Sequence, residues 1–111
     1  MRKYRNNPVT VNGIRYDSER EANRGCELAM LEKAGAIADL RRQVSYELAA
    51  GVTLHGEKRK RPAIRYVADF VYRDEGGLEV VEDVKGVDTP MSRLKRHLMA
   101  TRLGLMVRII K

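Results

Sequence analysis

The sequence predicts a single α/β (α+β) domain, in which helices flank a mixed β-sheet and a small β-hairpin comes first. Three observations predict this fold class. Short segments rich in Val, Ile, Tyr and Phe alternate with turn residues, as strands do. Two segments place apolar residues at helical spacing between capping signals. The second of these helices separates two strands by enough chain for a parallel crossover, which makes the sheet mixed.

The length and charge of the chain limit the kind of protein it encodes. Its 111 residues suit one domain, residues 1–111, and its formal net charge is +7. Such a charge favours an anionic partner, nucleic acid first and an anionic membrane surface second, and a basic protein without such a partner is the alternative. The single cysteine, Cys26, excludes an intramolecular disulfide and a cysteine zinc cluster.

The sequence contains no signal for a membrane or for export. No apolar run approaches the ~20 residues that span a bilayer. The basic start Met1–Tyr4 is not followed by an apolar stretch, as it would be in a signal peptide. We therefore expect a cytoplasmic protein with no membrane partner.

The N-terminal part, residues 1–17, is predicted to be a basic arm followed by a small hairpin. Residues 1–8 are polar and basic, and could lie along phosphates. Val9–Tyr16 is predicted to form the hairpin, because Asn12 and Gly13 are the preferred pair for a type I′ turn.

A first helix is predicted over Glu19–Ala34, between Ser18 and Gly35. Glu21 stands three residues after Ser18, which is the spacing of a capping box. Gly25 costs helix stability but would allow a close approach to the sheet. The predicted apolar stripe consists of Ala22, Cys26, Ala29 and Met30, widened by Leu28 and Leu31.

A short strand is predicted over Gln43–Leu48, and the densest basic run of the chain, Gly56–Pro62, follows it. Such runs are usually solvated loop tips. The functional alternative is a phosphate clamp beside the site described next, because this loop leads into the strand that carries the first acid. The residues of this clamp would be Lys58, Arg59, Lys60 and Arg61.

The centre of the chain, Ala63–Gly86, is predicted to be a β-hairpin that carries acids on both arms. Its arms are Arg65–Tyr72 and Leu78–Lys85, joined by a turn of Asp, Glu and Gly residues. Asp69 on the first arm faces an acid on the second. With a loop over residues 74–78 the opposite residue is Asp83, and with a loop one residue shorter it is Glu82.

Two carboxylates that face each other across a strand pair need a physical explanation. Like charges in this position are destabilising, and burial without a partner adds to the cost. Either one acid stays protonated or a cation lies between them, and carboxylate oxygens suit Mg²⁺, with Mn²⁺ able to substitute. Lys85 lies on the same face as Asp83. The alternative is that Asp69 and Asp83 are strand-end residues, solvated or paired with Lys85 and Arg65.

A second helix is predicted over Pro90–Leu103, with Thr89 as its N-cap and Gly104 after its end, and a strand over Leu105–Ile110. The residues expected to face the sheet are Met91, Leu94, Leu98, Ala100 and Leu103. The opposite surface would be cationic, through Arg93, Lys95, Arg96, His97 and Arg102. This surface is either an ordinary solvated face or, through Arg93, Lys95 and Arg96, a grip on the strand being cut.

The acids and the lysine also resemble a known motif. Asp69, followed in the next strand by Asp83-Val84-Lys85, resembles the PD-(D/E)XK motif of nucleases. Further matched features are Tyr4-Arg5-Asn6, Asp17–Arg24, Ala68-Asp69-Phe70, Glu82–Gly86 and Arg93-Leu94-Lys95. The whole set resembles small phage-encoded proteins with a compact nuclease core. Ala68 stands where the motif has proline, which is often missing there.

The resemblance implies an αβββαβ, restriction-endonuclease-like core and a Mg²⁺-dependent endodeoxyribonuclease. Asp69, Asp83, Glu21 and the backbone carbonyl of Val84 would hold the metal, although capping and metal binding by Glu21 are hard to satisfy together. Lys85 would act on the attacking water, and cleavage would leave a 5′-phosphate. In a phage protein the compartment would be the host cytoplasm.

The substrate follows from what the chain lacks. No base-reading module is recognisable, so contacts should be mostly to the DNA backbone, which favours branched or nicked DNA over a defined duplex site. Cutting both strands would need a homodimer. The alternatives are a nucleic-acid-binding protein that keeps the fold without catalysis, and a protein-binding phage accessory factor.

Overall fold

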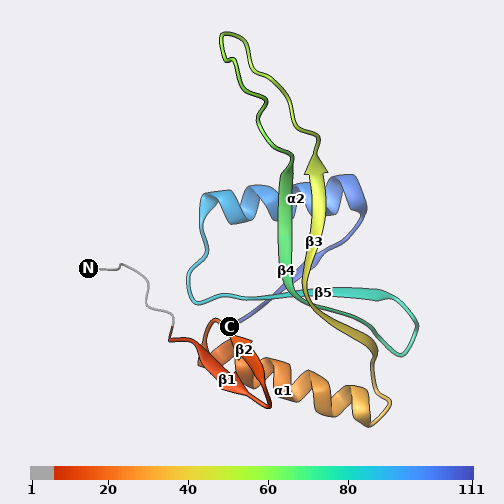
Figure 1. Ribbon diagram of the computed structural model, residues 1–111. Coiled ribbons are helices and arrows are strands. Elements are labelled where there is room, and N and C mark those ends of the chain that lie inside the picture. Colours follow the sequence, from red (N-terminus) through yellow and green to blue (C-terminus); the bar gives the residue numbers. More distant parts are fainter. Residues whose placement is uncertain (1–6) are drawn as a thin grey trace.

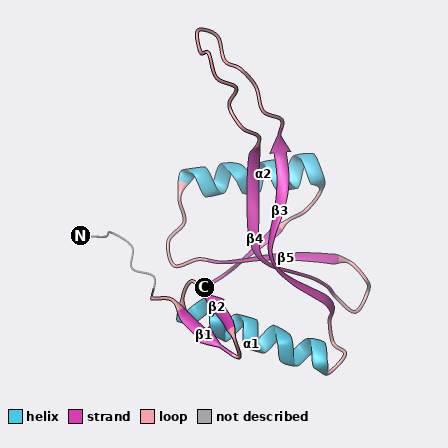
Figure 2. Ribbon diagram, in the orientation of Figure 1, coloured by secondary structure: helices cyan, strands magenta, loops and turns pink. Residues whose placement is uncertain are grey.

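The computed structural model describes residues 7–111, so most of the predicted basic arm, with Tyr4-Arg5-Asn6, lies outside the described residues. The fold is α+β, as predicted: a two-stranded hairpin precedes two helices and a four-stranded mixed sheet (Figures 1 and 2). After the hairpin the elements follow the predicted αβββαβ order. The sheet order is β3-β4-β5-β6, antiparallel except for the parallel pair β5 and β6.

The N-terminal hairpin pairs β1 (Val9–Val11) with β2 (Ile14–Tyr16) in the predicted register. Asn12 and Gly13 have φ angles of 51° and 78°, as a type I′ turn requires. Helix α1 (Glu19–Lys33) follows directly. The Oγ of Ser18 accepts a hydrogen bond from the N–H of Glu21 at 3.1 Å, which confirms the predicted N-cap.

The predicted apolar stripe of α1 is wrong by part of a turn. The buried residues are Glu21, Ala22, Gly25 and Leu28, whereas Ala29 and Met30 are exposed. The reason is the hairpin, which packs against α1 through Tyr16: a Cβ on Gly25 would lie 2.7 Å from Cε1 of that ring. Gly25 therefore permits a close approach, but to the small hairpin rather than to the main sheet.

Strands β3 (Ala38–Ala49) and β4 (Ile64–Arg73) are longer than predicted, and both change face near their middle. Residues two apart normally lie on the same face of a strand. Tyr66 and Ala68 nevertheless pack in one hydrophobic core, and Phe70 and Tyr72 in the other. The change of face occurs at Asp69. Opposite it on β3, Gln43 has a φ of +52°, a backbone conformation that residues other than glycine rarely adopt.

Strand β5 (Glu79–Val84) pairs with β4 in the first of the two predicted registers. Asp74 N–H bonds to the carbonyl of Leu78 at 3.0 Å, and the ladder runs from Arg73 opposite Glu79 to Phe70 opposite Glu82. The loop therefore spans residues 74–78, and Asp69 is the counterpart of Asp83 rather than of Glu82.

Helix α2 (Pro90–Leu103) has the predicted bounds, with Thr89 as N-cap and Gly104 in a left-handed conformation, and β6 (Val107–Ile110) is parallel to β5. The buried face of α2 differs from the prediction. Met99 is the buried residue, whereas Met91, Leu94 and Leu103 are exposed. Lys95 and Arg96 are half-buried, because long cationic side chains cover the sheet with their stems and keep their charges outside.

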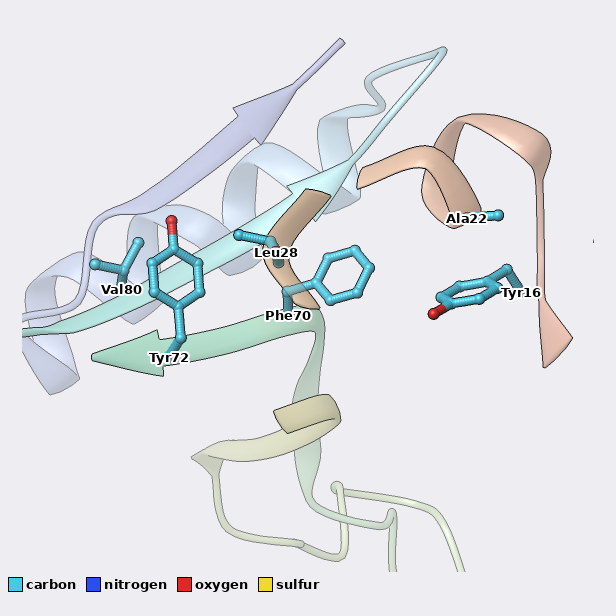
Figure 3. Packing of buried hydrophobic residues seen from close by; sticks show 6 residues of the cluster. All are labelled: Tyr16, Ala22, Leu28, Phe70, Tyr72 and Val80. Carbon is cyan, nitrogen blue, oxygen red and sulfur yellow. The ribbon is translucent and has the colours of Figure 1, made fainter. Parts of the chain in front are cut away.

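The two helices cover opposite faces of the sheet. Met99 of α2 packs in a core that includes Val71 and Val81, and α1 packs on the opposite face. Figure 3 shows the core under α1, where Phe70 lies beside Leu28, with Tyr16 and Ala22 to one side and Tyr72 and Val80 to the other. Between residues 7 and 111, neither helix has the length and apolar character needed to cross a bilayer.

Candidate active site

The predicted acid pair lies where β4 and β5 separate, a place called the fork below. The last paired residues of the ladder are Phe70 and Glu82. Asp69 and Asp83 are the next residues on each strand, and they lie close enough for Asp83 to raise the pKa of Asp69. On the far side of this point from the β4–β5 turn, β4 is paired with β3 and β5 with β6, and the two strands take different directions (Figure 1). The β4–β5 ladder therefore ends just before the two acids.

Asp69 is held from two sides by hydrogen bonds. Its Oδ2 accepts the N–H of Val84 at 2.8 Å, and its Oδ1 accepts Nε2 of Gln43 at 3.2 Å. Burial, followed by the hydrogen bond and the charge of Asp83, raises the pKa of Asp69 to about 8. Without a cation, the pair therefore holds a proton near neutral pH. This is the first of the two remedies expected for facing acids.

Asp83 is buried, and both of its contacts converge on Oδ2. The hydroxyl of Tyr66 donates to it at 2.5 Å, and Nζ of Lys85 lies 3.0 Å away. Burial, followed by the hydrogen bond to Asp83, raises the pKa of Tyr66, so that this hydroxyl stays a proton donor. The ion pair with Lys85 is the contact that the strand-end alternative also expected, whereas Arg65 lies 3.5 Å from Glu47 instead.

Glu21 lies near the pair but has a partner of its own. It is only 4% exposed, and its Oε2 accepts a hydrogen bond from Arg42 at 3.1 Å. Burial raises the pKa of Glu21, and the charges of Asp17 and Asp83 add to the effect. The cap uses its backbone N–H and leaves the carboxylate free to point inward. Capping by Ser18 and an interior role for Glu21 are therefore compatible, contrary to expectation.

The fit of this site to a metal ion rests on two carboxylates. Within residues 7–111, no three His, Cys, Asp or Glu side chains come together closely enough to hold an ion. Mg²⁺ keeps several waters and is commonly held by one or two carboxylates plus substrate phosphate, so Asp69 and Asp83 suit it. A third ligand from Glu21 would require Arg42 to release it.

Val84 presents its backbone to the pair. Its N–H bonds to Asp69, and the N–H and C=O of one strand residue point to the same side. Its carbonyl is therefore directed toward β4, beyond the end of the ladder. A role of this carbonyl as a ligand stays a prediction, and this orientation is compatible with it.

An open cleft of about 320 Å³ lies at the fork. It is bounded by the first half of β4, the end of β5 and the N-terminal turns of α2. Asp83 lines it together with three cationic side chains, those of Arg65, Lys85 and Lys95. A buried acid thus lines a cleft whose other charged residues are cationic, which is an arrangement suited to an anionic ligand.

The predicted cationic grip on α2 is divided between two places. Lys95 lines the cleft. Arg93 and Arg96 lie against Asp88, at 3.6 Å and 2.5 Å from its Oδ2, and the hydrogen bond from Arg96 holds the pKa of Asp88 below its ordinary value. Of the three predicted residues, only Lys95 is therefore placed at the acids.

The basic run Lys58–Arg61 is not beside the acids. It lies in the loop between β3 and β4 (residues 50–63), which projects away from the body of the protein (Figure 1). A clamp beside the site is therefore not what the structure has. Arg61 also makes a double hydrogen bond to Glu57, at 2.9 Å and 2.7 Å.

Glu82, which precedes Asp83, has a structural role on the opposite face. Arg24 donates two hydrogen bonds to it, at 2.8 Å and 2.7 Å, and the hydroxyl of Tyr72 donates a third. This fully buried acid is thus compensated by a cation and a phenol. Arg24, in the matched segment Asp17–Arg24, holds α1 to β5 and forms no hydrogen bond or ion pair with Asp69 or Asp83.

Several residues of the site were missed in the sequence. Tyr66 contacts Asp83, Gln43 contacts Asp69, and Arg42 contacts Glu21. Tyr66 offered one signal, because a buried tyrosine three residues before an acid needs a partner for its hydroxyl. Gln43 and Arg42 offered none, since their positions depend on the change of face in β3.

Comparisons with known proteins place the chain in a family without assigning an activity. No curated protein and no solved structure matches the chain. A family model described as "Protein of unknown function (DUF1064)" matches residues 1–109, almost the entire sequence that forms the hairpin, the sheet and the fork. The chain therefore belongs to the DUF1064 family.

Proposed function

We propose that the protein is a Mg²⁺-dependent endodeoxyribonuclease. The observation that carries the proposal is the arrangement at the fork. Asp83 lines a cleft whose other charged residues are cationic, with Nζ of Lys85 3.0 Å from its Oδ2. Asp69, whose pKa is raised to about 8, is its counterpart on β4 just beyond the end of the β4–β5 ladder. Acids that face each other on neighbouring strands destabilise the fold. A metal ion bound between them would explain why both are present.

Each group of the chain has a role in this proposal. A Mg²⁺ ion held by Asp69 and Asp83 would lower the pKa of a bound water and screen charge on the phosphate. Lys85 would orient the attacking water and donate to a phosphate oxygen. Asp69 holds a proton in the metal-free state and would release it when a cation binds. Arg65 and Lys95 would bind the phosphates on either side of the scissile bond.

The substrate is expected to be recognised through its backbone. The charged residues of the cleft other than Asp83 are cations that suit phosphates, and the described residues include no helix-turn-helix or zinc finger. DNA with a nick or a branch is therefore favoured, because it exposes a scissile phosphate without base readout.

Incubation with supercoiled plasmid and a panel of single-stranded, duplex, nicked and four-way DNAs, with Mg²⁺, Mn²⁺ or EDTA, tests the proposal. We expect nicking that depends on the divalent ion. Asp83→Asn and Lys85→Met should each lower the rate by about 10³-fold or more, while DNA binding persists. Glu75→Gln, at an exposed position of the β4–β5 turn, is the control and should keep full activity.

A non-catalytic DNA-binding protein is the second candidate. Its supporting observation is that Glu21 is occupied by Arg42 and Asp83 by Lys85, so these acids are compensated by the protein itself. In that case no metal-dependent product forms with any substrate. Asp83→Asn should then tighten DNA binding, because it removes a negative charge from a cationic cleft.

A further inference from the structure

The β3–β4 loop leads directly into the strand that carries one cation of the cleft. Arg65 lines the cleft and lies one residue after the start of β4. Before it in the chain, and farther from the acids, come Lys60, Arg59 and Lys58, which are exposed. We propose that this loop is a DNA-binding arm, which follows the backbone of a duplex for about one helical turn on one side of the cleavage site. The direction from the cleavage site rests on the proposed function.

The loop is held together by hydrogen bonds between its two halves, which a solvated loop tip does not need. Val52 and Arg61 exchange two backbone hydrogen bonds, at 3.0 Å and 2.7 Å, across the loop. The side chain of Arg61 is fixed to Glu57. A Cβ on Gly51 would lie 2.6 Å from the carbonyl oxygen of Arg61, so the two halves of the loop approach closely there. Loops of this length without regular secondary structure are uncommon and are usually either functional or disordered. The backbone bonds across this loop argue against disorder.

The ion pair between Arg61 and Glu57 also determines which cations of the loop are available to a ligand. Arg61 is neutralised by Glu57, so it serves the loop itself. Lys58, Arg59 and Lys60 have no ion-pair partner within residues 7–111. Three consecutive unpaired cations repel one another, and a line of phosphates would relieve that repulsion.

The reach of the loop follows from its place in the chain. Lys58 precedes Asp69 by 11 residues, so at ~3.3 Å per residue it lies at most about 36 Å away. At ~3.4 Å per base pair, this corresponds to about ten base pairs of duplex. The loop extends away from the helices and the hairpin, so a bound duplex would meet no other element beyond the cleft (Figure 1).

The loop suits a duplex better than a single strand. Proteins that bind single strands stack the bases on aromatic side chains. Residues 50–63 contain no Phe, Tyr or Trp, so the loop offers charge without such a stacking platform. Contacts from a lysine-rich loop to the phosphates of a duplex need no stacking.

The test uses Lys58→Gln, Arg59→Gln and Lys60→Gln together in the full chain. The matched control is Lys33→Gln, Arg102→Gln and Lys111→Gln, which removes the same charge from exposed positions elsewhere. Binding of both variants and of the natural sequence to blunt duplexes of graded length is measured by fluorescence anisotropy in EDTA, over a range of salt concentrations. Metal-dependent nicking is measured in parallel.

For the loop variant we expect the slope of log K against log salt to fall by about 2 to 3, at ~0.9 per lost phosphate contact. The duplex length at which affinity stops rising should shorten by several base pairs, up to about ten. The control should change neither by a comparable amount. An unchanged slope or length limit in the loop variant, an equal effect in the control, or no binding to duplex by the natural sequence would overturn the proposal.

The two proposals fail separately. If nicking persists in the natural sequence but the loop variant binds every duplex as the control does, the arm is wrong and the nuclease stands. If no nicking occurs with any metal but the slope and length effects are present, the nuclease is wrong and the loop remains a duplex-binding arm.

Discussion

Asp69 is the residue at which stability and the proposed activity conflict. Its carboxyl group is partly buried, next to Asp83, and a proton relieves the repulsion when no cation is present. A group whose pKa is raised from 3.8 in the unfolded chain to about 8 binds more protons when folded. Its contribution to stability is therefore complete below about pH 4 and is lost as the pH rises toward 8.

Asp69→Asn should remove this conflict. At pH 8 to 9 in EDTA we expect the variant to be more stable than the natural sequence by about 1–3 kcal/mol, because the amide carries no charge at any pH. Below pH 4 the difference should vanish. Urea unfolding at several pH values measures the effect. Glu75→Gln, at the exposed turn, is the control and should show no such dependence; an equal gain there would contradict the argument.

The same raised pKa predicts that Mg²⁺ binds more tightly as the pH rises. The ion has to displace the proton of the acid pair, so its affinity should increase by up to about tenfold per pH unit below pH 8 and then level off. Isothermal titration calorimetry in buffers of different ionisation enthalpy would detect the released proton. An affinity independent of pH between 6 and 8 would exclude a proton shared by the pair.

Two tyrosines lie on opposite faces of β4, and comparing them distinguishes a role in the candidate site from a role in stability. Tyr66 donates to Asp83 at the fork, and Tyr72 donates to the buried Glu82 under α1. Burial raises the pKa of Tyr72 to about 12, so it is also a donor at neutral pH. Removing either hydroxyl leaves a buried carboxylate with one donor fewer.

Tyr66→Phe should lower kcat for nicking by about tenfold, because Asp83 loses the donor that fixes its orientation. Tyr72→Phe should instead lower the free energy of unfolding by about 1–3 kcal/mol and leave the activity of the folded protein unchanged. Urea unfolding and nicking rates on the same preparations measure both effects. Equal losses of activity in the two variants would remove Tyr66 from the site.

Among the elements, β3 and β4 matter most for the site, because their change of face opens the fork. A regular pair would carry the β4–β5 ladder past Asp69 and bury both acids against neighbouring strands. The unusual φ of Gln43 costs energy, of the order of 1–2 kcal/mol for a residue other than glycine. Strain of this kind is typical of functional sites. The side chain of Gln43, 3.2 Å from Asp69, gives that position a second purpose.

Gly25→Ala tests the packing of α1 on the hairpin. Alanine favours a helix by ~1 kcal/mol over glycine, but a Cβ at 2.7 Å from the Tyr16 ring forces that ring to move. Arg42 stacks on the same ring at 4.3 Å and holds Glu21, so the disturbance should reach Glu21. We expect a net loss of stability of about 1–2 kcal/mol by thermal unfolding. Asn23→Ala, exposed on the same helix, should gain stability; a gain in both variants would contradict the contact.

The elements were predictable from the sequence wherever local signals set them. Thr89, Pro90 and Gly104 fixed both ends of α2, and Asn12-Gly13 fixed the hairpin. The buried faces of the helices were not predictable in the same way. Met91 and Leu94 are apolar yet exposed, because what a helix buries depends on the elements that pack on it.

The candidate site was also predictable only where local signals determine it. The facing of Asp69 and Asp83 follows from alternation along two strands and one turn, which are local properties. The contacts of Arg42 and Gln43 with the acids depend on the change of face in β3, which is a tertiary property. The same holds for the distance between the basic loop and the fork, since strand lengths were underestimated.

At the scale of the whole molecule, the acids lie at the junction of two hydrophobic cores. The core under α1 includes Phe70 and the core under α2 includes Ala68, so Asp69 lies where β4 passes from one core to the other. Each face of the sheet is packed at this junction, and the cleft lies beside it. A ligand can therefore reach the buried Asp83 without local unfolding of the protein. The cleft is therefore a consequence of how the sheet divides its two faces.

One chain carries one such junction, and this predicts the course of plasmid cleavage. In the proposed nuclease a single acid pair would cut one strand, so supercoiled plasmid should be converted to open circles first, and linear DNA should appear only as second nicks accumulate. The rate of the first step should be proportional to protein concentration. Gel electrophoresis of timed samples over a hundredfold range of concentration measures both. Linear product at the earliest times, with a rate that rises as the square of the concentration, would mean that two copies act together. Each copy's cleft would then have to face a separate strand of one duplex.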